Sequence, residues 1–202
     1  MILNLPNLLT ISRILFLPLF VGGFYLADPA ARWVTFVVFA LAGITDFFDG
    51  YIARARRQVS SFGRFLDPVA DKLLIVSAIV MLTAFDRIAG LVVLPALVIL
   101  CREILVSGLR EFLAEVQIGV PVSRLAKWKT GIQMVAIACL LLGDAVPGLP
   151  LETAGVVGIW GAAALTLLTG YDYFRSGLVH VLKAPPGEKP DADSSRGSST
   201  TT

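Results

Sequence analysis

Charged residues are scarce in this chain of 202 residues, where they make up 16% of the sequence, against about 25% in an ordinary soluble domain. Their signs nearly cancel to a net charge of +2, so the basic excess typical of nucleic-acid binding is missing. Only two cysteines are present, and Cys101 and Cys139 lie in apolar runs without metal-ligand or redox spacing. We therefore expect two buried packing cysteines, no disulfide framework and no nucleic-acid partner.

Apolar residues are abundant instead. They form 56% of the chain, and the mean hydropathy of +0.79 is too high for a soluble domain of this size. A helix that spans a bilayer needs about 20 mostly apolar residues. Six stretches fit this requirement, namely 8–26, 33–52, 73–85, 88–105, 130–146 and 151–174. The sequence therefore predicts an all-α, polytopic integral membrane protein with six transmembrane helices.

The basic residues of the connections alternate between the two sides of these predicted spans. One side holds Arg54, Arg56, Arg57, Arg64, Lys72, Arg110, Arg124, Lys127 and Lys129, whereas the other side holds only Arg32 and Arg87. The positive-inside rule then predicts that both termini and the basic connections face the cytoplasm of a cell membrane. After residue 183 the apolar residues give way to proline, serine, threonine and charge. We expect a transmembrane domain over 1–183 and a disordered cytoplasmic tail over 184–202.

Four aspartates crowd into residues 45–72, where charge beside a membrane helix needs a reason. Asp46 and Asp49 are three residues apart and Asp67 and Asp71 are four apart, so each pair projects from one helix face. Four converging carboxylates repel each other unless cations compensate them, and oxygen ligands favour Mg²⁺ or Mn²⁺. Spacing alone leaves three interpretations open: a metal site for a phosphorylated ligand, aspartate–arginine pairs that hold helices together, and the cation pathway of a transporter.

Glycines and an arginine accompany the aspartates. Gly50 and Arg54 share a helix face with the first pair, and Gly63 precedes the second. The whole pattern, Asp46-x2-Asp49-Gly50-x2-Ala53-Arg54-x8-Gly63-x3-Asp67-x3-Asp71, resembles the signature of the CDP-alcohol phosphatidyltransferases at every fixed position. Eight fixed positions in 26 residues make a chance match improbable.

The resemblance implies a reaction and roles for these residues. In this family the aspartates hold two divalent ions, Mg²⁺ or Mn²⁺, against the diphosphate of CDP-diacylglycerol, and an acceptor hydroxyl attacks the lipid phosphorus with release of CMP. Asp46, Asp49, Asp67 and Asp71 would then be the metal ligands, and Asp71 also the base for the acceptor hydroxyl. Gly50, Arg54, Ser60 and Gly63 would contact the CDP-lipid. The family also suggests a homodimer embedded in membrane lipid.

The N-terminal stretch carries a polar edge on an otherwise apolar helix. Asn7, Thr10 and Arg13 recur every three residues, and the stretch NLPNLLTISRI resembles the family's CDP-lipid-binding region. Helix capping is an equally open interpretation for Asn7 and Thr10.

The acceptor site is predicted from cations on the same side of the membrane as the aspartates. Arg102, Arg110, Arg124, Lys127 and Lys129 would suit an anionic acceptor such as glycerol 3-phosphate. The elements RE…SGLRE and KxKT…QM resemble those of bacterial phosphatidylglycerophosphate synthases. Phosphatidylglycerol or an inositol phosphate remains an alternative acceptor. Interfacial anchoring by Lys127-Trp128-Lys129, and pairing of Arg102 and Glu103 with neighbouring helices, remain open as structural interpretations.

Three glycines spaced by three residues, Gly155, Gly158 and Gly161, predict close packing of the last span against a neighbouring helix or subunit.

Overall fold

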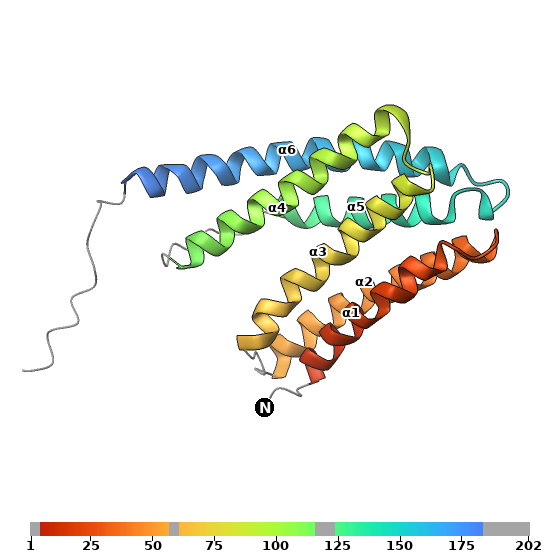
Figure 1. The fold of residues 1–202 in the computed structure, drawn as a ribbon. Helices are drawn as coiled ribbons and strands as arrows, with labels where there is room; N and C mark the ends of the chain where they lie inside the picture. Colours follow the sequence, from red (N-terminus) through yellow and green to blue (C-terminus); the bar gives the residue numbers. More distant parts are fainter. Residues whose placement is uncertain (1–4, 57–60, 116–123, 184–202) are drawn as a thin grey trace, which may run out of the picture.

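The computed structural model describes residues 5–56, 61–115 and 124–183, and this part of the chain is entirely helical (Figure 1). Its six α-helices follow the six predicted apolar stretches. They are α1 (Leu5–Gly23), α2 (Ala30–Arg56), α3 (Ser61–Ala84), α4 (Val93–Glu115), α5 (Arg124–Leu142) and α6 (Leu151–Lys183), with short 3-10 turns η1 (Gly90–Val92) and η2 (Gly143–Ala145). The predicted tail over 184–202 lies outside the described residues.

Five of the six helices are longer than the predicted spans, and α1 has the same length as its span. α2 continues to Arg56, α4 continues to Glu115 and α6 continues to Lys183. A helix satisfies its own backbone hydrogen bonds whatever its side chains are, so it need not end where the apolar residues end. The predicted spans therefore locate the apolar part of a helix but not its ends.

The six helices form two groups that meet in one core. α1 packs against α2 and α3, α6 packs against α4 and α5, and α2 also contacts α5. The groups lie close together at the end that carries the loops after α1, α3 and α5, and they diverge toward the end that carries the N-terminus (Figure 1). The shared core includes Phe20, Phe39, Leu82, Ile137 and Ile159, all almost completely buried.

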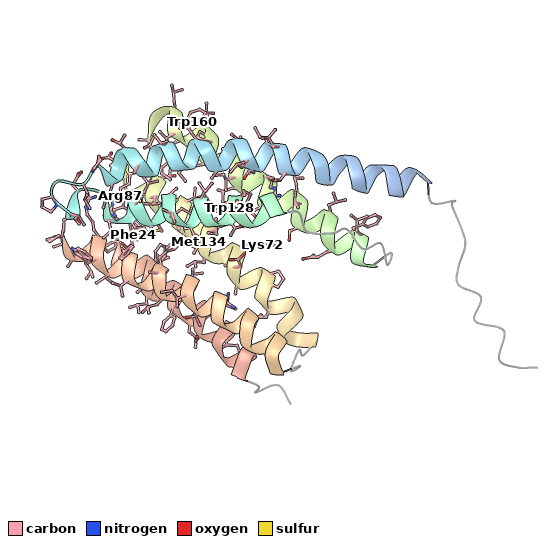
Figure 2. All side chains as sticks on the ribbon, turned by 180° about the vertical axis from the view of Figure 1, so that it is seen from behind. Phe24, Lys72, Arg87, Trp128, Met134 and Trp160 are labelled. Carbon is pink, nitrogen blue, oxygen red and sulfur yellow. The ribbon has the colours of Figure 1, made fainter. Side chains whose placement is uncertain are left out.

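The outer surface is also apolar. Large side chains such as Leu15, Val80, Leu94 and Leu105 are exposed, and Trp160 projects outward from α6 (Figure 2). Stretches Gly90–Leu113 and Leu151–Gly170 are long and apolar enough to cross a membrane. Exposed apolar faces of this extent are typical of helices that contact lipid.

The apolar outer surface explains why the cysteine prediction is wrong in part. Cys101 is exposed on α4, and Cys139 is only partly buried on α5. In a helix that is apolar all round, an apolar sequence neighbourhood does not distinguish a buried position from an outward-facing one.

The glycine prediction is confirmed at two of its three positions. A Cβ atom at Gly158 would lie 2.6 Å from the Cβ of Ala136, and one at Gly155 would lie 2.6 Å from Leu140. These two glycines therefore allow α5 and α6 to approach closely. A Cβ atom at Gly161 would meet nothing within 4 Å, so this glycine makes no close contact with another helix in the described part of the chain.

Charged residues tie the loops together at the end where the helices converge. In this loop-end ion cluster (Asp28, Arg32, Arg87 and Asp144), Arg32 lies 3.4 Å from Asp28 and 3.9 Å from Asp144, and Arg87 lies 3.7 Å from Asp28. Both arginines also donate to α5, Arg87 to the Leu141 carbonyl at 3.0 Å and Arg32 to the Leu142 carbonyl at 3.4 Å. The last carbonyls of a helix lack intrahelical donors, so the two arginines cap α5.

The Arg87 side chain contacts an aromatic ring in addition to its polar partners. Its guanidinium lies 5.3 Å from the centre of the Phe24 ring, and the two side chains lie together at one end of the molecule (Figure 2). Burial lowers the pKa of Arg87, the charge of Arg32 lowers it further, and Asp28 partly offsets both effects. The guanidinium stays charged because the ordinary pKa of arginine lies far above neutrality.

Candidate active site

The four signature aspartates lie on two helices at the end of the molecule where the helix groups diverge. Asp46 and Asp49 lie in the last three turns of α2, and Asp67 and Asp71 lie in the first eleven residues of α3 (Figure 1). Only residues 57–60 separate the two helices. The backbone therefore brings the segments that carry both aspartate pairs toward one end of the bundle.

Five predicted site residues have described side chains: Thr10, Arg13, Asp71, Arg102 and Lys129. Outside the described residues lie the side chains of Asn7, Asp46, Asp49, Gly50, Arg54, Ser60, Gly63, Asp67, Arg110, Arg124 and Lys127. For the residues of this group that lie on helices, the structure gives only the helix and the position along it.

Two of the three residues that form the polar edge of α1 are buried. Thr10 is 0% exposed and Arg13 is 5% exposed. Because α1 packs against α2 and α3, these side chains lie against the two helices that carry the aspartates. Thr10 is the sixth described residue of α1, which excludes the capping interpretation for it. A buried arginine beside a carboxylate-bearing helix end suits an anionic ligand such as a diphosphate.

A second group of polar residues joins the other three helices. In this α4–α6 polar cluster (Arg102, Glu103, Lys129 and Thr169), Lys129 donates to the Glu103 carboxylate and is 2% exposed. Arg102 lies 3.8 Å from the same carboxylate and donates to the Thr169 hydroxyl at 3.2 Å. Two cations share one anion, so the cluster carries a net charge of +1.

The aspartate helix and the polar cluster are neighbours. Asp71 lies close enough to Lys129 to contribute an attractive electrostatic interaction, and its side chain is exposed. The next residue, Lys72, lies 3.9 Å from Glu111 on α4. The exposed carboxylate at the start of α3 therefore borders a buried positive region formed by α4, α5 and α6.

The contacts of Glu103 and the exposure of Trp128 and Lys129 bear on two structural interpretations, namely helix pairing and interfacial anchoring. Pairing of Glu103 with a neighbouring helix is confirmed by its bond with Lys129. Interfacial anchoring fits Trp128, which is 71% exposed, but fails for Lys129, which is buried. The alternation follows from helix geometry, since consecutive residues lie about 100° apart around the axis.

One buried polar residue near the cluster was given no role of its own by the sequence reasoning, although it belongs to the element KxKT…QM. Gln133 lies one turn after Lys129 on α5 and is 2% exposed. The signal that could have found it is a carboxamide in the apolar stretch 130–146, because polar side chains inside a span are rare and need a reason.

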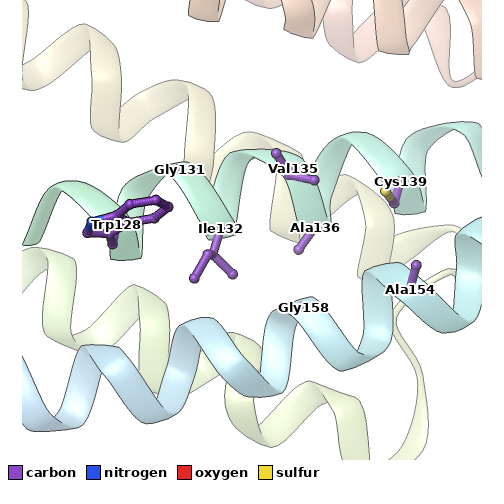
Figure 3. Close-up of a pocket in the computed structure, with 8 residues that line it drawn as sticks. All are labelled: Trp128, Gly131, Ile132, Val135, Ala136, Cys139, Ala154 and Gly158. Atoms are coloured by element: carbon purple, nitrogen blue, oxygen red, sulfur yellow. The ribbon is translucent and has the colours of Figure 1, made fainter. Parts of the chain in front are cut away.

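A separate hollow on the outer face has no polar lining residue among the described residues. This apolar groove of about 530 Å³ runs between α5 and α6 and is lined by Trp128, Gly131, Val135, Cys139, Ala154 and Gly158, among others (Figure 3). Its lining offers nothing to a phosphorylated or metal-bound ligand. This groove is thus separate from the α4–α6 polar cluster.

The four signature aspartates lie on α2 and α3, and buried cations lie on the neighbouring helices. The sequence matches a family described as CDP-alcohol phosphatidyltransferase over residues 3–168. The chain belongs to this family of enzymes, whose members generally use a divalent metal.

Curated relatives share most of the chain. A Rickettsia felis protein is 52% identical over 174 residues, which cover 86% of this chain and 94% of the relative. Proteins of Salmonella paratyphi A and Cereibacter sphaeroides are 43% and 40% identical, over 86% and 88% of this chain and 94% and 97% of the relatives. All three are named CDP-diacylglycerol–glycerol-3-phosphate 3-phosphatidyltransferase.

Proposed function

We propose that this chain transfers the phosphatidyl group of CDP-diacylglycerol to sn-glycerol 3-phosphate, giving phosphatidylglycerophosphate and CMP. The observation that carries this proposal is that an acidic region, the signature aspartates, lies next to a cationic region, the α4–α6 polar cluster. The signature aspartates end at Asp71 on α3, and α3 contacts α4 and α5, which carry the buried cations of the α4–α6 polar cluster. A nucleotide-activated lipid and an anionic acceptor need such neighbouring sites, and the names of the relatives agree with this pair of substrates.

The aspartates suit divalent metal by their chemistry. Asp46, Asp49, Asp67 and Asp71 offer only oxygen donors from two helices at one end of the bundle, which favours Mg²⁺ or Mn²⁺. A two-metal site there would neutralise the diphosphate and stabilise the departing CMP. Asp71 is assigned a second role, in which its exposed carboxylate takes the proton from the attacking hydroxyl.

The remaining residues bind and orient the two substrates. Thr10 and Arg13, with Asn7, Gly50, Arg54, Ser60 and Gly63, are assigned to the CDP-lipid. Buried Arg13 supplies positive charge against the helices that carry the aspartates. Arg102, Arg110, Arg124, Lys127 and Lys129 are assigned to the acceptor phosphate. Because Glu103 already engages Arg102 and Lys129, it fixes their positions and compensates part of their positive charge.

The proposal places the protein in the cell membrane as a six-span homodimer, with both termini and the active site on the cytoplasmic side. The exposed apolar faces of the helices and the placement of basic residues support this arrangement. The acyl chains of the donor would stay in the bilayer, while the soluble acceptor and CMP exchange with the cytoplasm.

The test is an acceptor panel with purified protein in mixed micelles. CDP-diacylglycerol and a divalent metal are supplied with glycerol 3-phosphate, phosphatidylglycerol or inositol phosphate, and both CMP and the lipid product are measured. We expect phosphatidylglycerophosphate from glycerol 3-phosphate alone, and no turnover in a folded Asp67→Asn variant. Intact CDP-diacylglycerol with every acceptor would refute the transferase assignment, and a product from another acceptor would correct the substrate.

A further inference from the structure

The side chain of Gln133 is buried with one hydrogen-bonding atom unused. Gln133 is 2% exposed, and its carboxamide oxygen has no hydrogen-bond partner within the described part of the chain. Buried polar atoms are almost always paired in folded proteins, because burial removes the hydrogen bonds that water would make. An unpaired acceptor at this depth therefore needs an explanation.

Its position points to the acceptor pocket. Gln133 follows Lys129 by four residues on α5, so the two side chains share one face and lie about 6 Å apart along the helix axis. Lys129 belongs to the α4–α6 polar cluster and interacts electrostatically with Asp71. The carboxamide therefore lies on the same inner face as the proposed acceptor site, one turn beyond its lysine.

Within residues 5–56, 61–115 and 124–183, no described side chain donates a hydrogen bond to this oxygen. The backbone N–H groups inside a helix are already used in its own ladder. Thr166 is also buried with an unpaired side-chain oxygen, but a threonine hydroxyl can turn and donate to a carbonyl of its own helix. A glutamine oxygen only accepts, so it needs a donor from outside α5.

We propose that Gln133 is a specificity-determining residue that binds the acceptor hydroxyl that does not react. This inference rests on the proposed function. Glycerol 3-phosphate has two hydroxyls, and only one of them attacks the lipid phosphorus. The other, on the central carbon, remains free to bind the protein. A hydroxyl both donates and accepts, so it satisfies the carboxamide whichever way the amide is turned.

This role predicts discrimination against acceptors that lack the second hydroxyl. Without it, binding would leave the buried oxygen unpaired in the complex. A site built to hydrogen-bond a substrate hydroxyl rejects the analogue that lacks it for this reason. The cations assigned to the acceptor phosphate cannot supply this discrimination, since an acceptor that lacks the second hydroxyl still carries the same phosphate.

The experiment compares glycerol 3-phosphate with 3-hydroxypropyl phosphate, which keeps the phosphate and the primary hydroxyl but lacks the central one. We measure kcat/KM for both acceptors at saturating CDP-diacylglycerol in the wild type and in Gln133→Met, which keeps the side-chain length. The wild type should prefer glycerol 3-phosphate by at least about tenfold. In Gln133→Met the preference should fall to within about twofold, with KM for CDP-diacylglycerol unchanged.

Thr35→Val is the matched control, because Thr35 is a buried polar residue far from the cluster, whose hydroxyl donates to the Ala31 carbonyl at 2.7 Å. It should keep the wild-type preference. If Gln133→Met does not fold, Gln133→Asn replaces it and should show an intermediate preference.

Two results would overturn the inference while the proposed function stands. One is an unchanged preference in the Gln133 variants. The other is equal use of the two acceptors by the wild type, which needs no variant at all. Failure of the wild type to use glycerol 3-phosphate would instead refute the proposed function, and this inference with it.

Discussion

Removal of the Glu103 carboxylate tests the buried ion pair directly. The Lys129 side chain is 3% exposed and that of Glu103 is 23% exposed, so Glu103→Gln leaves the lysine buried without its anion. Breaking a buried pair in this way destabilises a protein by about 3–5 kcal/mol. The residual exposure of Glu103 and its second neighbour Arg102 place the expected loss near 3 kcal/mol, or a decrease of about 6–12 °C in Tm.

The double variant separates stability from function. Lys129→Met combined with Glu103→Gln removes both charges, so we expect its Tm to return close to that of the wild type. Activity should not return, because the acceptor phosphate has lost a cation that is worth about tenfold to a hundredfold in KM. Thermal unfolding in detergent and initial rates against glycerol 3-phosphate give both quantities.

Glu111→Gln on the same helix is the control. Its partner Lys72 lies 3.9 Å away, and Glu111 is 74% exposed, so this change should alter Tm only slightly. A Glu103→Gln variant as stable as Glu111→Gln would refute the burial argument. A double variant with the wild-type KM for glycerol 3-phosphate would remove Lys129 from the acceptor site.

Three further outcomes are expected. Arg124→Ala should raise KM for glycerol 3-phosphate more than KM for CDP-diacylglycerol, and steady-state kinetics with equal effects on both would take Arg124 out of the acceptor pocket. Gly158→Val should lower stability by about 1–3 kcal/mol, because its Cβ meets Ala136 at 2.6 Å. Gly161→Val, with nothing within 4 Å, should fold like the wild type in the same unfolding assay. A cysteine introduced in place of Ser61 should react with an impermeant maleimide only in inverted vesicles, and labelling of intact cells would reverse the proposed topology.

The helices and the aspartate signature could be predicted from the sequence because both are local patterns. Apolar runs locate all six helices, and the spacing of Asp67 and Asp71 places them on one face of α3. Helix ends could not be predicted as well, since backbone hydrogen bonding continues through charged turns such as the end of α6. Hydropathy detects the apolar segment rather than the helix.

Contacts between helices are the part that local patterns do not contain. Glu103 and Lys129 are 26 residues apart and meet only because α4 and α5 both pack around α6. The same limit applies to Cys101, which an apolar neighbourhood suggests is buried and which packing leaves exposed. Which face of an apolar helix points inward depends on its neighbours, and those are set by the whole bundle.

The arginine caps of α5 give the loop end a mechanical influence on the distant active site. Leu141, whose carbonyl Arg87 holds, and Lys129 are twelve residues apart, so about 18 Å of rigid helix lies between them. Over that length, a tilt of about 3° at the capped end displaces the lysine by about 1 Å, and errors of this size in positioning can reduce turnover about a hundredfold. Substitutions at Arg87 should therefore impair catalysis from the opposite end of the helix bundle, without touching either substrate.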